Sequence, residues 1–318
     1  MRTVPLGEAG VEVSALCLGC MFFGTRVDKT ASIHLLDRCV AAGGFFLDTA
    51  DNYAFWVEGG RGGESETLLG EWMRGRGNRD QLFLATKVGG MPGEDLSRAA
   101  IRAAVEGSLR RLGTDRIDLY YAHIDHRGVA LEETLDAFGE LVRAGKVRHI
   151  GCSNYAAWRV ERARRISDAC GLPRYCCVQQ RHSYLRPRPG SSFGAQRVAD
   201  DELLDFCSAN PEVALLAYSP LLSGAYTMPD RPLPDQYLGP ATDAQLTALT
   251  HVARATGATH NQVVLAWLMT SAPSAIPLIA ASTEAQLDEN LGALSLKLSS
   301  EHMATLNTAS AGAVHDQR

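Results

Sequence analysis

The chain has 318 residues and a formal net charge of −5, and its 46% hydrophobic and 21% charged residues are ordinary values for a globular protein. Such a mild charge offers no electrostatic surface for nucleic acid, so we expect no nucleic-acid partner. No apolar run reaches the roughly 18 residues of a membrane helix, and no basic segment followed by an apolar run opens the chain. We therefore expect a cytoplasmic protein with no membrane segment.

The chain begins with two short runs of β-forming residues between positions 3 and 13, which flank Gly7 and Gly10 as in a β-hairpin. After this segment, eight short apolar runs alternate with stretches of helical period, which is typical of β–α–β units in a parallel sheet. In chain order, the predicted strands are Ala15–Gly19, Phe45–Asp48, Leu82–Lys87, Ile117–His123, Val147–Cys152, Tyr175–Gln179, Ala214–Tyr218 and Ala275–Leu278. The predicted helices are Ala31–Ala42, Ser65–Arg74, Ser97–Leu112, Leu131–Ala144, Trp158–Ala169, Asp201–Ala209, Gln262–Met269 and Glu284–Leu294.

Eight β–α units predict the α/β class and a closed (β/α)8 barrel, or TIM barrel, in place of an open sheet. We expect the N-terminal hairpin to cap the bottom of this barrel. A barrel of this kind takes roughly 250 residues, so residues 1–318 are predicted to form one domain. Two long loops, 52–63 and 181–198, interrupt the alternation, and long loops in a compact domain often have a function.

Polar residues stand at the ends of the predicted strands, where the active site of a (β/α)8 barrel lies. Each one alone has an ordinary structural explanation, as a helix cap, a turn residue or a solvated charge. Three successive strands, however, end in Asp48, Lys87 and His123, and Tyr53 follows Asp48 closely. Together these four residues predict one shared site at the barrel mouth.

These residue types suit the interconversion of a carbonyl and an alcohol. A tyrosine hydroxyl can donate the proton that the developing alkoxide needs, but its ordinary pKa is about 10. We expect Lys87 to lower the pKa of Tyr53, Asp48 to hold Lys87 in its charged form, and His123 to orient the substrate oxygen. Because no side chain donates hydride, a redox cofactor is required.

Eight cysteines are spread through apolar runs, which favours buried, reduced thiols. Cys17 and Cys20 have the C-x-x-C spacing of zinc and redox sites, but no second such pair and no histidine pair at zinc spacing follows. A metal-dependent barrel hydrolase or isomerase, a third possibility, needs clustered ligands at the strand ends, where only Asp48 and His123 qualify, with Asp125 and His126 close by. We therefore predict no metal site.

At these residues the chain resembles the aldo-keto reductase superfamily over nearly its whole length. The resemblance is carried by the ordered motifs Leu18–Gly24, Gly44–Tyr53, Ser65–Gly70, Ala85–Lys87, Ile117–His123, Gly145–Asn154 and Ala217–Leu221. It implies a (β/α)8 barrel, an NADH or NADPH cofactor, no metal, and a catalytic tetrad of Asp48, Tyr53, Lys87 and His123. In this tetrad Tyr53 is the general acid and base.

The resemblance also implies a set of cofactor-binding residues. Ser153, Asn154 and Gln179 match the residues that hold the nicotinamide carboxamide, and Tyr218 matches the ring that stacks on the nicotinamide. The remaining matches surround the rest of the dinucleotide and are Cys20, Met21, Ser219, Leu221, Ser223, Ser282, Gln286, Glu289 and Asn290. No G-x-G-x-x-G follows the first strand, so a Rossmann-type site is not supported.

Several positions depart from the family pattern. NADPH-binding relatives place Lys or Arg near the 2′-phosphate after the last strand, whereas this chain has no basic residue there and has Glu284. Because a phosphate usually requires a basic partner, we predict that NADH is used at least as well as NADPH, although Ser282 and Thr283 are available to bind a phosphate. His182 stands where relatives usually have Tyr, and Cys20 where they often have Thr.

The substrate class is the least determined feature of the sequence. Phe22, Phe23 and Trp56 are candidate pocket residues, which would either stack on a substrate or simply roof the barrel. We expect a small carbonyl or alcohol substrate such as a sugar, with Arg181 and His126 on a solvated rim. The alternative function is a non-catalytic barrel that binds a nicotinamide dinucleotide as a sensor or auxiliary subunit.

Overall fold

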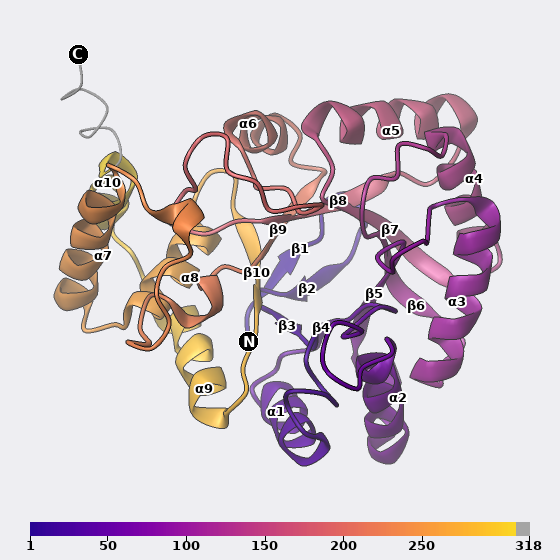
Figure 1. Ribbon diagram of the computed structural model, residues 1–318, viewed down its shortest axis with the longest axis horizontal. Coiled ribbons are helices and arrows are strands. Elements are labelled where there is room, and N and C mark those ends of the chain that lie inside the picture. The colour runs from indigo at the N-terminus through magenta and orange to yellow at the C-terminus, as the bar shows by residue number, and fades with distance from the viewer. Residues whose placement is uncertain (310–318) are drawn as a thin grey trace.

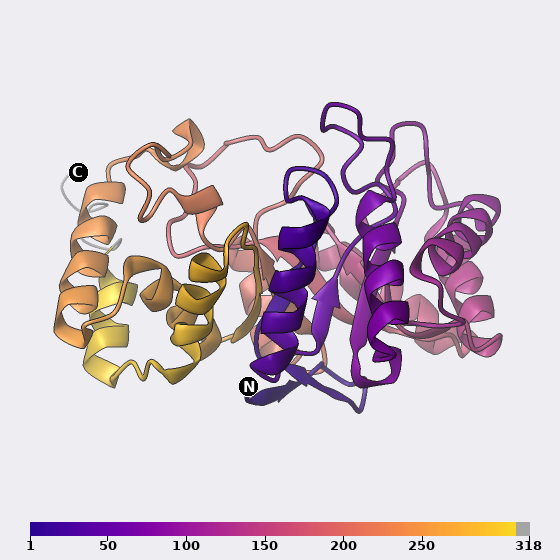
Figure 2. The ribbon, with the colours of Figure 1, turned by 90° about the horizontal axis from the view of Figure 1, so that it is seen from below.

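The computed structural model describes residues 1–309, and its first element is the predicted hairpin. Strands β1 (Thr3–Pro5) and β2 (Glu12–Ser14) pair in antiparallel fashion, with Thr3 opposite Ser14. The hairpin lies across one end of the barrel (Figure 2). Leu6 and Val13 are fully buried and pack with side chains of the barrel interior. The hairpin therefore caps the bottom of the barrel, as predicted.

Within residues 1–309, eight parallel strands close into a barrel (Figure 1). Each strand pairs with the next one along the chain, and the last strand pairs with the first. All eight strands were predicted, with ends that differ by at most two residues. They are β3 (Cys17–Gly19), β4 (Phe46–Asp48), β5 (Phe83–Val88), β6 (Ile117–Ala122), β7 (Val147–Ser153), β8 (Tyr175–Arg181), β9 (Ala214–Tyr218) and β10 (Ala275–Ile279).

The helices surround the barrel, and none of those in residues 1–309 is long and apolar enough to cross a membrane. Two of them were not predicted, α7 (Thr242–Thr256) and α10 (Ser300–Thr308). Helix α10 buries a single side chain, Leu306, so its apolar signal in the sequence is weak, whereas α7 buries Leu249 and Val252 on a face otherwise made of Ala, Thr and Gln. The others are α1 (Lys29–Ala41), α2 (Glu64–Arg76), α3 (Arg98–Leu112), α4 (Leu131–Arg143), α5 (Ala157–Cys170), α6 (Asp201–Ala209), α8 (His260–Thr270) and α9 (Glu284–Gly292).

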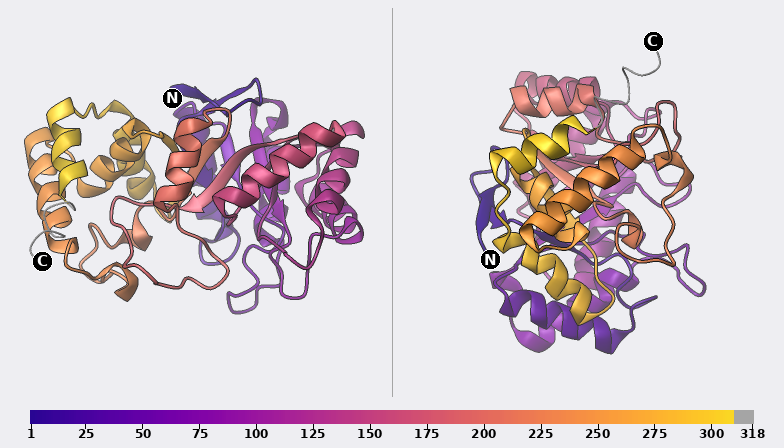
Figure 3. Two further views of the ribbon diagram at one scale, coloured as in Figure 1. Left: turned by 90° about the horizontal axis from the view of Figure 1, so that it is seen from above. Right: turned by 90° about the vertical axis from the view of Figure 1, so that its left-hand side faces the viewer.

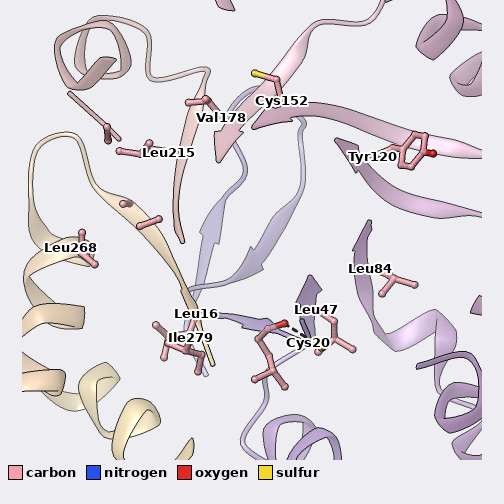
Figure 4. Packing of buried hydrophobic residues seen from close by; sticks show 14 of the residues in the cluster. Leu16, Cys20, Leu47, Leu84, Tyr120, Cys152, Val178, Leu215, Leu268 and Ile279 are labelled. Atoms are coloured by element: carbon pink, nitrogen blue, oxygen red, sulfur yellow. Dashed lines mark hydrogen bonds between the residues drawn. The ribbon is translucent and has the colours of Figure 1, made fainter. Parts of the chain in front are cut away.

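The strands are buried on both faces, and alternate side chains point to opposite faces. One set packs between the strands and the helices and includes Leu47, Leu84, Tyr120, Val178 and Leu215 (Figure 4). The other set fills the barrel interior and includes Phe46, Phe83, Ala85, Leu119, Tyr121, Cys177 and Leu216. The predicted polar site residues lie two positions further along the strands from the last of these inward-facing side chains, at the carboxyl ends of the strands.

A buried acid links neighbouring strands at the end of the barrel opposite the carboxyl ends of the strands. Asp118, near the start of β6, is fully buried and accepts a hydrogen bond from the backbone N–H of Leu84 at 2.9 Å. Arg79 and Arg148 approach its two carboxylate oxygens to 2.8 and 3.0 Å. This network joins β5, β6 and β7 far from the carboxyl ends of the strands, so its role is structural.

Candidate active site

The four residues of the predicted tetrad lie together at the carboxyl ends of the strands. The loops that follow the strands gather on the face opposite the hairpin (Figures 2 and 3). Asp48 ends β4, Lys87 lies near the end of β5, and His123 directly follows β6. Tyr53 lies in the turn after β4, whose backbone is tied back by hydrogen bonds from Thr49 N to Ala85 O (2.9 Å) and from Tyr53 N to Ala50 O (3.2 Å).

The ammonium group of Lys87 is fully buried, and each of its three protons has an acceptor. Lys87 Nζ donates to the carbonyl oxygen of Thr49 at 2.7 Å and to the phenolic oxygen of Tyr53 at 3.1 Å. The third bond goes to Oδ1 of Asp48. Because Tyr53 accepts from Lys87, the hydroxyl proton of Tyr53 must point elsewhere and is free for a substrate oxygen.

The carboxylate of Asp48 is held from both sides. Its Oδ1 contacts Lys87 and its Oδ2 accepts a hydrogen bond from Gln179 Nε2 at 2.9 Å. Burial raises the pKa of Asp48, while the ammonium of Lys87 and the Gln179 bond oppose that rise. Burial also disfavours the charge on Lys87, but Asp48 and Tyr53 more than offset this and raise the pKa of Lys87. Lys87 is therefore charged at neutral pH.

Tyr53 differs from expectation in its titration. Burial raises the pKa of Tyr53 above its ordinary value, and the nearby ammonium of Lys87 only partly offsets this effect. The expected lowering of the pKa by Lys87 is therefore outweighed in this structure, because the phenol is 9% exposed and an isolated phenolate is costly there. Tyr53 is a protonated phenol at neutral pH, which is the form needed to donate a proton.

His123 faces Tyr53 edge to face, with ring centroids 5.8 Å apart. Burial, with a smaller contribution from Lys87, lowers its pKa well below the ordinary value, so the imidazole is neutral. Its Nδ1 is buried without a partner in the described structure. A Cβ atom at Gly90 would lie 2.4 Å from this nitrogen and 2.6 Å from Asn52 Nδ2, so a larger residue fits at position 90 only if one of these side chains moves.

The residues expected at the nicotinamide carboxamide form one hydrogen-bonded group. Ser153 Oγ donates to the carbonyl oxygen of Gln179 at 2.9 Å, and Asn154 Nδ2 donates to that of His123 at 3.0 Å. The phenolic hydroxyl of Tyr218 donates to Asn154 Oδ1 at 2.8 Å. The structure thus brings Ser153, Asn154, Gln179 and Tyr218 together directly beside the tetrad.

The loop after β9 carries unusual backbone strain. Ser219, Leu222 and Ser223 have φ values of 52°, 48° and 60°. Ser219 and Ser223 are two of the three residues expected around the pyrophosphate, and the third is Leu221. Non-glycine residues in this region cost energy and occur mainly where a loop is shaped around a ligand. Turns of this kind also direct backbone N–H groups toward an anion. The N–H groups of Leu222 and Gly224 already donate to carbonyl oxygens within the loop, at 3.2 and 2.9 Å, so an anion would be bound by the other N–H groups and the serine hydroxyls.

Polar side chains surround the start of α9, where the adenosine end of the cofactor is expected. Gln286 Oε1 accepts from both the backbone N–H and the hydroxyl of Ser282, at 2.8 and 2.9 Å. Glu289 accepts from Asn261 at 3.3 Å, and Asn290 donates to the carbonyl oxygen of Ala280 at 3.2 Å. The segment itself has no Lys or Arg, and the basic side chains that reach it come from α1, where Arg38 pairs with Asp288 at 2.8 Å and His34 lies 3.7 Å from Glu284.

The segment after β3 borders the tetrad through its backbone. Cys20 N donates to the carbonyl oxygen of Asp48 at 2.8 Å, whereas the Cys20 thiol is buried and faces the carbonyl of Leu18. Burial raises the pKa of the Cys20 thiol well above its ordinary value. Any cofactor contact at Cys20 is therefore expected from the backbone, with no role for a thiolate, whereas Met21 is only half-buried.

The candidate pocket aromatics separate into two groups. Trp56 is 42% exposed and stands edge to face with Tyr53, with ring centroids 5.9 Å apart. Phe22 is half-buried beneath the guanidinium of Arg26, which lies 4.7 Å from the ring centre. Phe23 is 1% exposed and packs in the hydrophobic core, so its side chain is not available to a substrate and Phe23 is not a pocket residue.

Two features beside the tetrad were not predicted. The carbonyl of Thr49 is the third acceptor of Lys87, and a backbone acceptor leaves no mark in the sequence. Asp51 is 8% exposed with both carboxylate oxygens unpartnered in the described structure. Burial, together with the carboxylates of Glu94 and Glu66, raises the pKa of Asp51 to about 8.

All eight cysteines are free thiols, buried except for Cys170. Within residues 1–309 no group of three or more His, Cys, Asp or Glu side chains is arranged to hold a metal ion.

Comparisons with known proteins agree with this geometry. Residues 15–311 match the model of the aldo/keto reductase family. The chain is 34% identical to norsolorinic acid reductase stcV of Emericella nidulans, covering 93% of this chain and 78% of that protein, and 32% identical to protein tas of Escherichia coli, covering 94% of each. A crystal structure of the thermostable aldo-keto reductase Tm1743, in complex with the inhibitor epalrestat, superposes with a TM-score of 0.78 at 30% identity, covering 97% of this chain and all of the other.

Three findings agree: the barrel topology, the buried ammonium–phenol contact at its mouth, and the family match over nearly the whole length. The chain belongs to the aldo/keto reductase family and is an NAD(P)H-dependent oxidoreductase.

Proposed function

We propose that this chain interconverts a carbonyl compound and an alcohol, with Tyr53 as the general acid in reduction and the general base in oxidation. The observation that carries this proposal is the hydrogen bond from Lys87 to the phenolic oxygen of Tyr53, at 3.1 Å. It keeps the hydroxyl proton free for the substrate oxygen and places a positive charge where negative charge develops as that proton leaves.

Each other member of the tetrad supports this transfer. Asp48 holds Lys87 through a buried contact and keeps it charged. The neutral imidazole of His123 lies beside Tyr53, where it can orient the substrate oxygen by a hydrogen bond. When bound, the nicotinamide cofactor supplies the hydride for carbonyl reduction or accepts it from the alcohol.

The residues of this chain that would hold the cofactor follow from their positions. Ser153, Asn154 and Gln179 are proposed to bind the nicotinamide carboxamide, and the ring of Tyr218 to stack on the nicotinamide. The backbone of the strained loop after β9 is proposed to bind the pyrophosphate. The adenosine end would lie against Ser282, Gln286, Glu289 and Asn290.

The cofactor preference that we propose is NADH at least equal to NADPH. The segment after β10 contains Glu284, which lies 3.7 Å from His34 Nδ1, and no Lys or Arg. A 2′-phosphate there would meet hydroxyl groups such as those of Ser282 and Thr283 and a carboxylate. Steady-state kinetics with both cofactors test this proposal, and a hundred-fold preference for NADPH would contradict it.

We further propose that the substrate is an aromatic carbonyl compound or the corresponding aryl alcohol. Relatives of this chain are named norsolorinic acid reductase and aryl-alcohol dehydrogenase. The exposed ring of Trp56 beside Tyr53 offers a face on which an aromatic substrate can stack. A sugar, the expectation from sequence, would use the same face and is the alternative that the substrate panel must separate.

The test is a panel of aryl aldehydes, aryl ketones, aryl alcohols and sugars, assayed in both directions with both cofactors. We expect turnover of aryl carbonyl compounds, followed by the absorbance of the reduced cofactor. Turnover of sugars alone would contradict the proposed substrate class. Cofactor binding without turnover of any compound would instead favour the non-catalytic dinucleotide-binding barrel.

A further inference from the structure

Arg181 is a cation at the barrel mouth that the tetrad does not use. It is the last residue of β8 and lies two residues beyond Gln179, so both side chains belong to the same face of the strand. Gln179 reaches Asp48 inside the barrel. Arg181 therefore lies directly above Gln179, in register with Tyr218 of the neighbouring strand.

The guanidinium of Arg181 is held in place without a carboxylate. Its centre lies 4.7 Å from the ring of Phe193 and 5.7 Å from the ring of Tyr218. Nε and Nη2 donate to Gln196 Oε1 at 3.2 and 2.8 Å. Within residues 1–309 no acidic side chain forms an ion pair with Arg181, so its positive charge is not neutralised by the protein.

The other ionisable groups beside Tyr218 carry little net charge. Lys87 and Asp48 form a buried pair whose charges cancel. Tyr53 is protonated and His123 is neutral, because burial disfavours the charged form of each. Arg197 lies nearby, since its backbone N–H donates to Asn154 at 3.0 Å, but it is exposed to solvent, whereas the guanidinium of Arg181 contacts the Tyr218 ring itself.

We propose that Arg181 makes this site bind the neutral, reduced nicotinamide more tightly than the positively charged, oxidised one. This inference rests on the proposed function, in which the nicotinamide stacks on Tyr218. The two cofactor forms are otherwise identical, so any contact of Arg181 with phosphate or ribose affects both equally. Only the charge on the ring distinguishes them, and a fixed cation repels the charged form.

The size of the effect follows from the distance. Stacked ring centroids are about 4.5 Å apart, so a ring stacked on Tyr218 would lie within roughly 10 Å of Arg181. At a separation of about 8 Å and an effective dielectric constant of about 40, Coulomb's law gives roughly a fivefold difference in dissociation constant. Such a difference favours release of the oxidised cofactor after a carbonyl has been reduced.

The experiment measures dissociation constants of the oxidised and reduced forms of one cofactor by quenching of protein fluorescence. It compares the unaltered chain with Arg181→Gln, Arg181→Lys and Arg165→Gln. Arg165 is 79% exposed on α5, so its variant controls for the loss of one positive charge. We expect the ratio of the oxidised to the reduced dissociation constant to fall about fivefold in Arg181→Gln and to stay within twofold in the other two.

The outcomes separate this inference from the proposed function. If the unaltered chain binds neither cofactor form, the proposed function fails and the inference fails with it. If both forms bind and the ratio in Arg181→Gln stays within twofold of the unaltered chain, the proposed function stands and the inference is overturned. A ratio that falls equally in Arg181→Gln and Arg181→Lys would also overturn it, because lysine keeps the charge.

Discussion

The unpartnered acid beside the active site gives a prediction about stability and pH. Asp51 is 8% exposed, its two carboxylate oxygens have no partner in residues 1–309, and its pKa is raised to about 8. An aspartate in the unfolded chain has an ordinary pKa near 3.8. Between these values the folded chain holds a proton that the unfolded chain has released. Stability therefore falls as pH rises from about 4 to about 8.

The magnitude follows from proton linkage. One proton changes the free energy of unfolding by about 1.4 kcal/mol per pH unit across this window. Asp51→Asn removes the titrating group, keeps its shape and stays neutral at every pH. We compare the free energy of unfolding of the variant with that of the unaltered chain at each pH. The variant's advantage should be about 2 to 4 kcal/mol larger at pH 8.5 than at pH 5.

Urea denaturation followed by circular dichroism at pH 5 and pH 8.5 measures this difference. Asp205→Asn, which changes an exposed aspartate on α6, controls for the loss of one negative charge. A stability difference between Asp51→Asn and the unaltered chain that is the same at both pH values would refute the reasoning. The carboxylate would then be as well solvated in the folded chain as in the unfolded one.

Two further predictions concern the two ends of the barrel. Gly90→Ala should lower kcat/KM about 10- to 100-fold, because the new Cβ must displace His123 or Asn52. Cofactor binding measured by fluorescence should change little. Normal activity in this variant would show that the position of His123 is not critical. Asp118→Ala should destabilise the chain by about 3 to 5 kcal/mol in urea denaturation, because two arginines lose their buried partner. The activity of the folded fraction should be unchanged, and a loss below about 1 kcal/mol would contradict this assignment.

The barrel itself was predictable because its signals are local and repeated. Each strand is a short apolar run, and each predicted helix carries an apolar stripe that the barrel buries. Helix α10 was not predicted because Leu306 is its one buried residue, and α7 was missed although it buries Leu249 and Val252 beside Ala248 and Ala253. Their place in the fold depends on packing against neighbouring helices, which no single segment of the sequence encodes.

The candidate site shows the same division. Asp48, Lys87 and His123 were predictable because strand ends converge at the barrel mouth. The direction in which the pKa of Tyr53 shifts was not predictable from the sequence. Burial outweighs the neighbouring ammonium, and the extent of burial is a property of the whole fold. Phe23 was assigned to the pocket by its position after β3, but its side chain turns into the core. The Arg181–Tyr218 contact joins β8 to β9 and depends on strand register.

The central claim is that the proton of Tyr53, kept free by Lys87, is donated to the substrate oxygen. The most direct measurement compares Tyr53→Phe with the unaltered chain in a single turnover with reduced cofactor and an aryl aldehyde, alongside the cofactor dissociation constant. We predict that the hydride-transfer rate falls by about 10² to 10⁴ while the dissociation constant stays within about twofold. A variant that keeps its rate within tenfold at an unchanged dissociation constant would contradict the account.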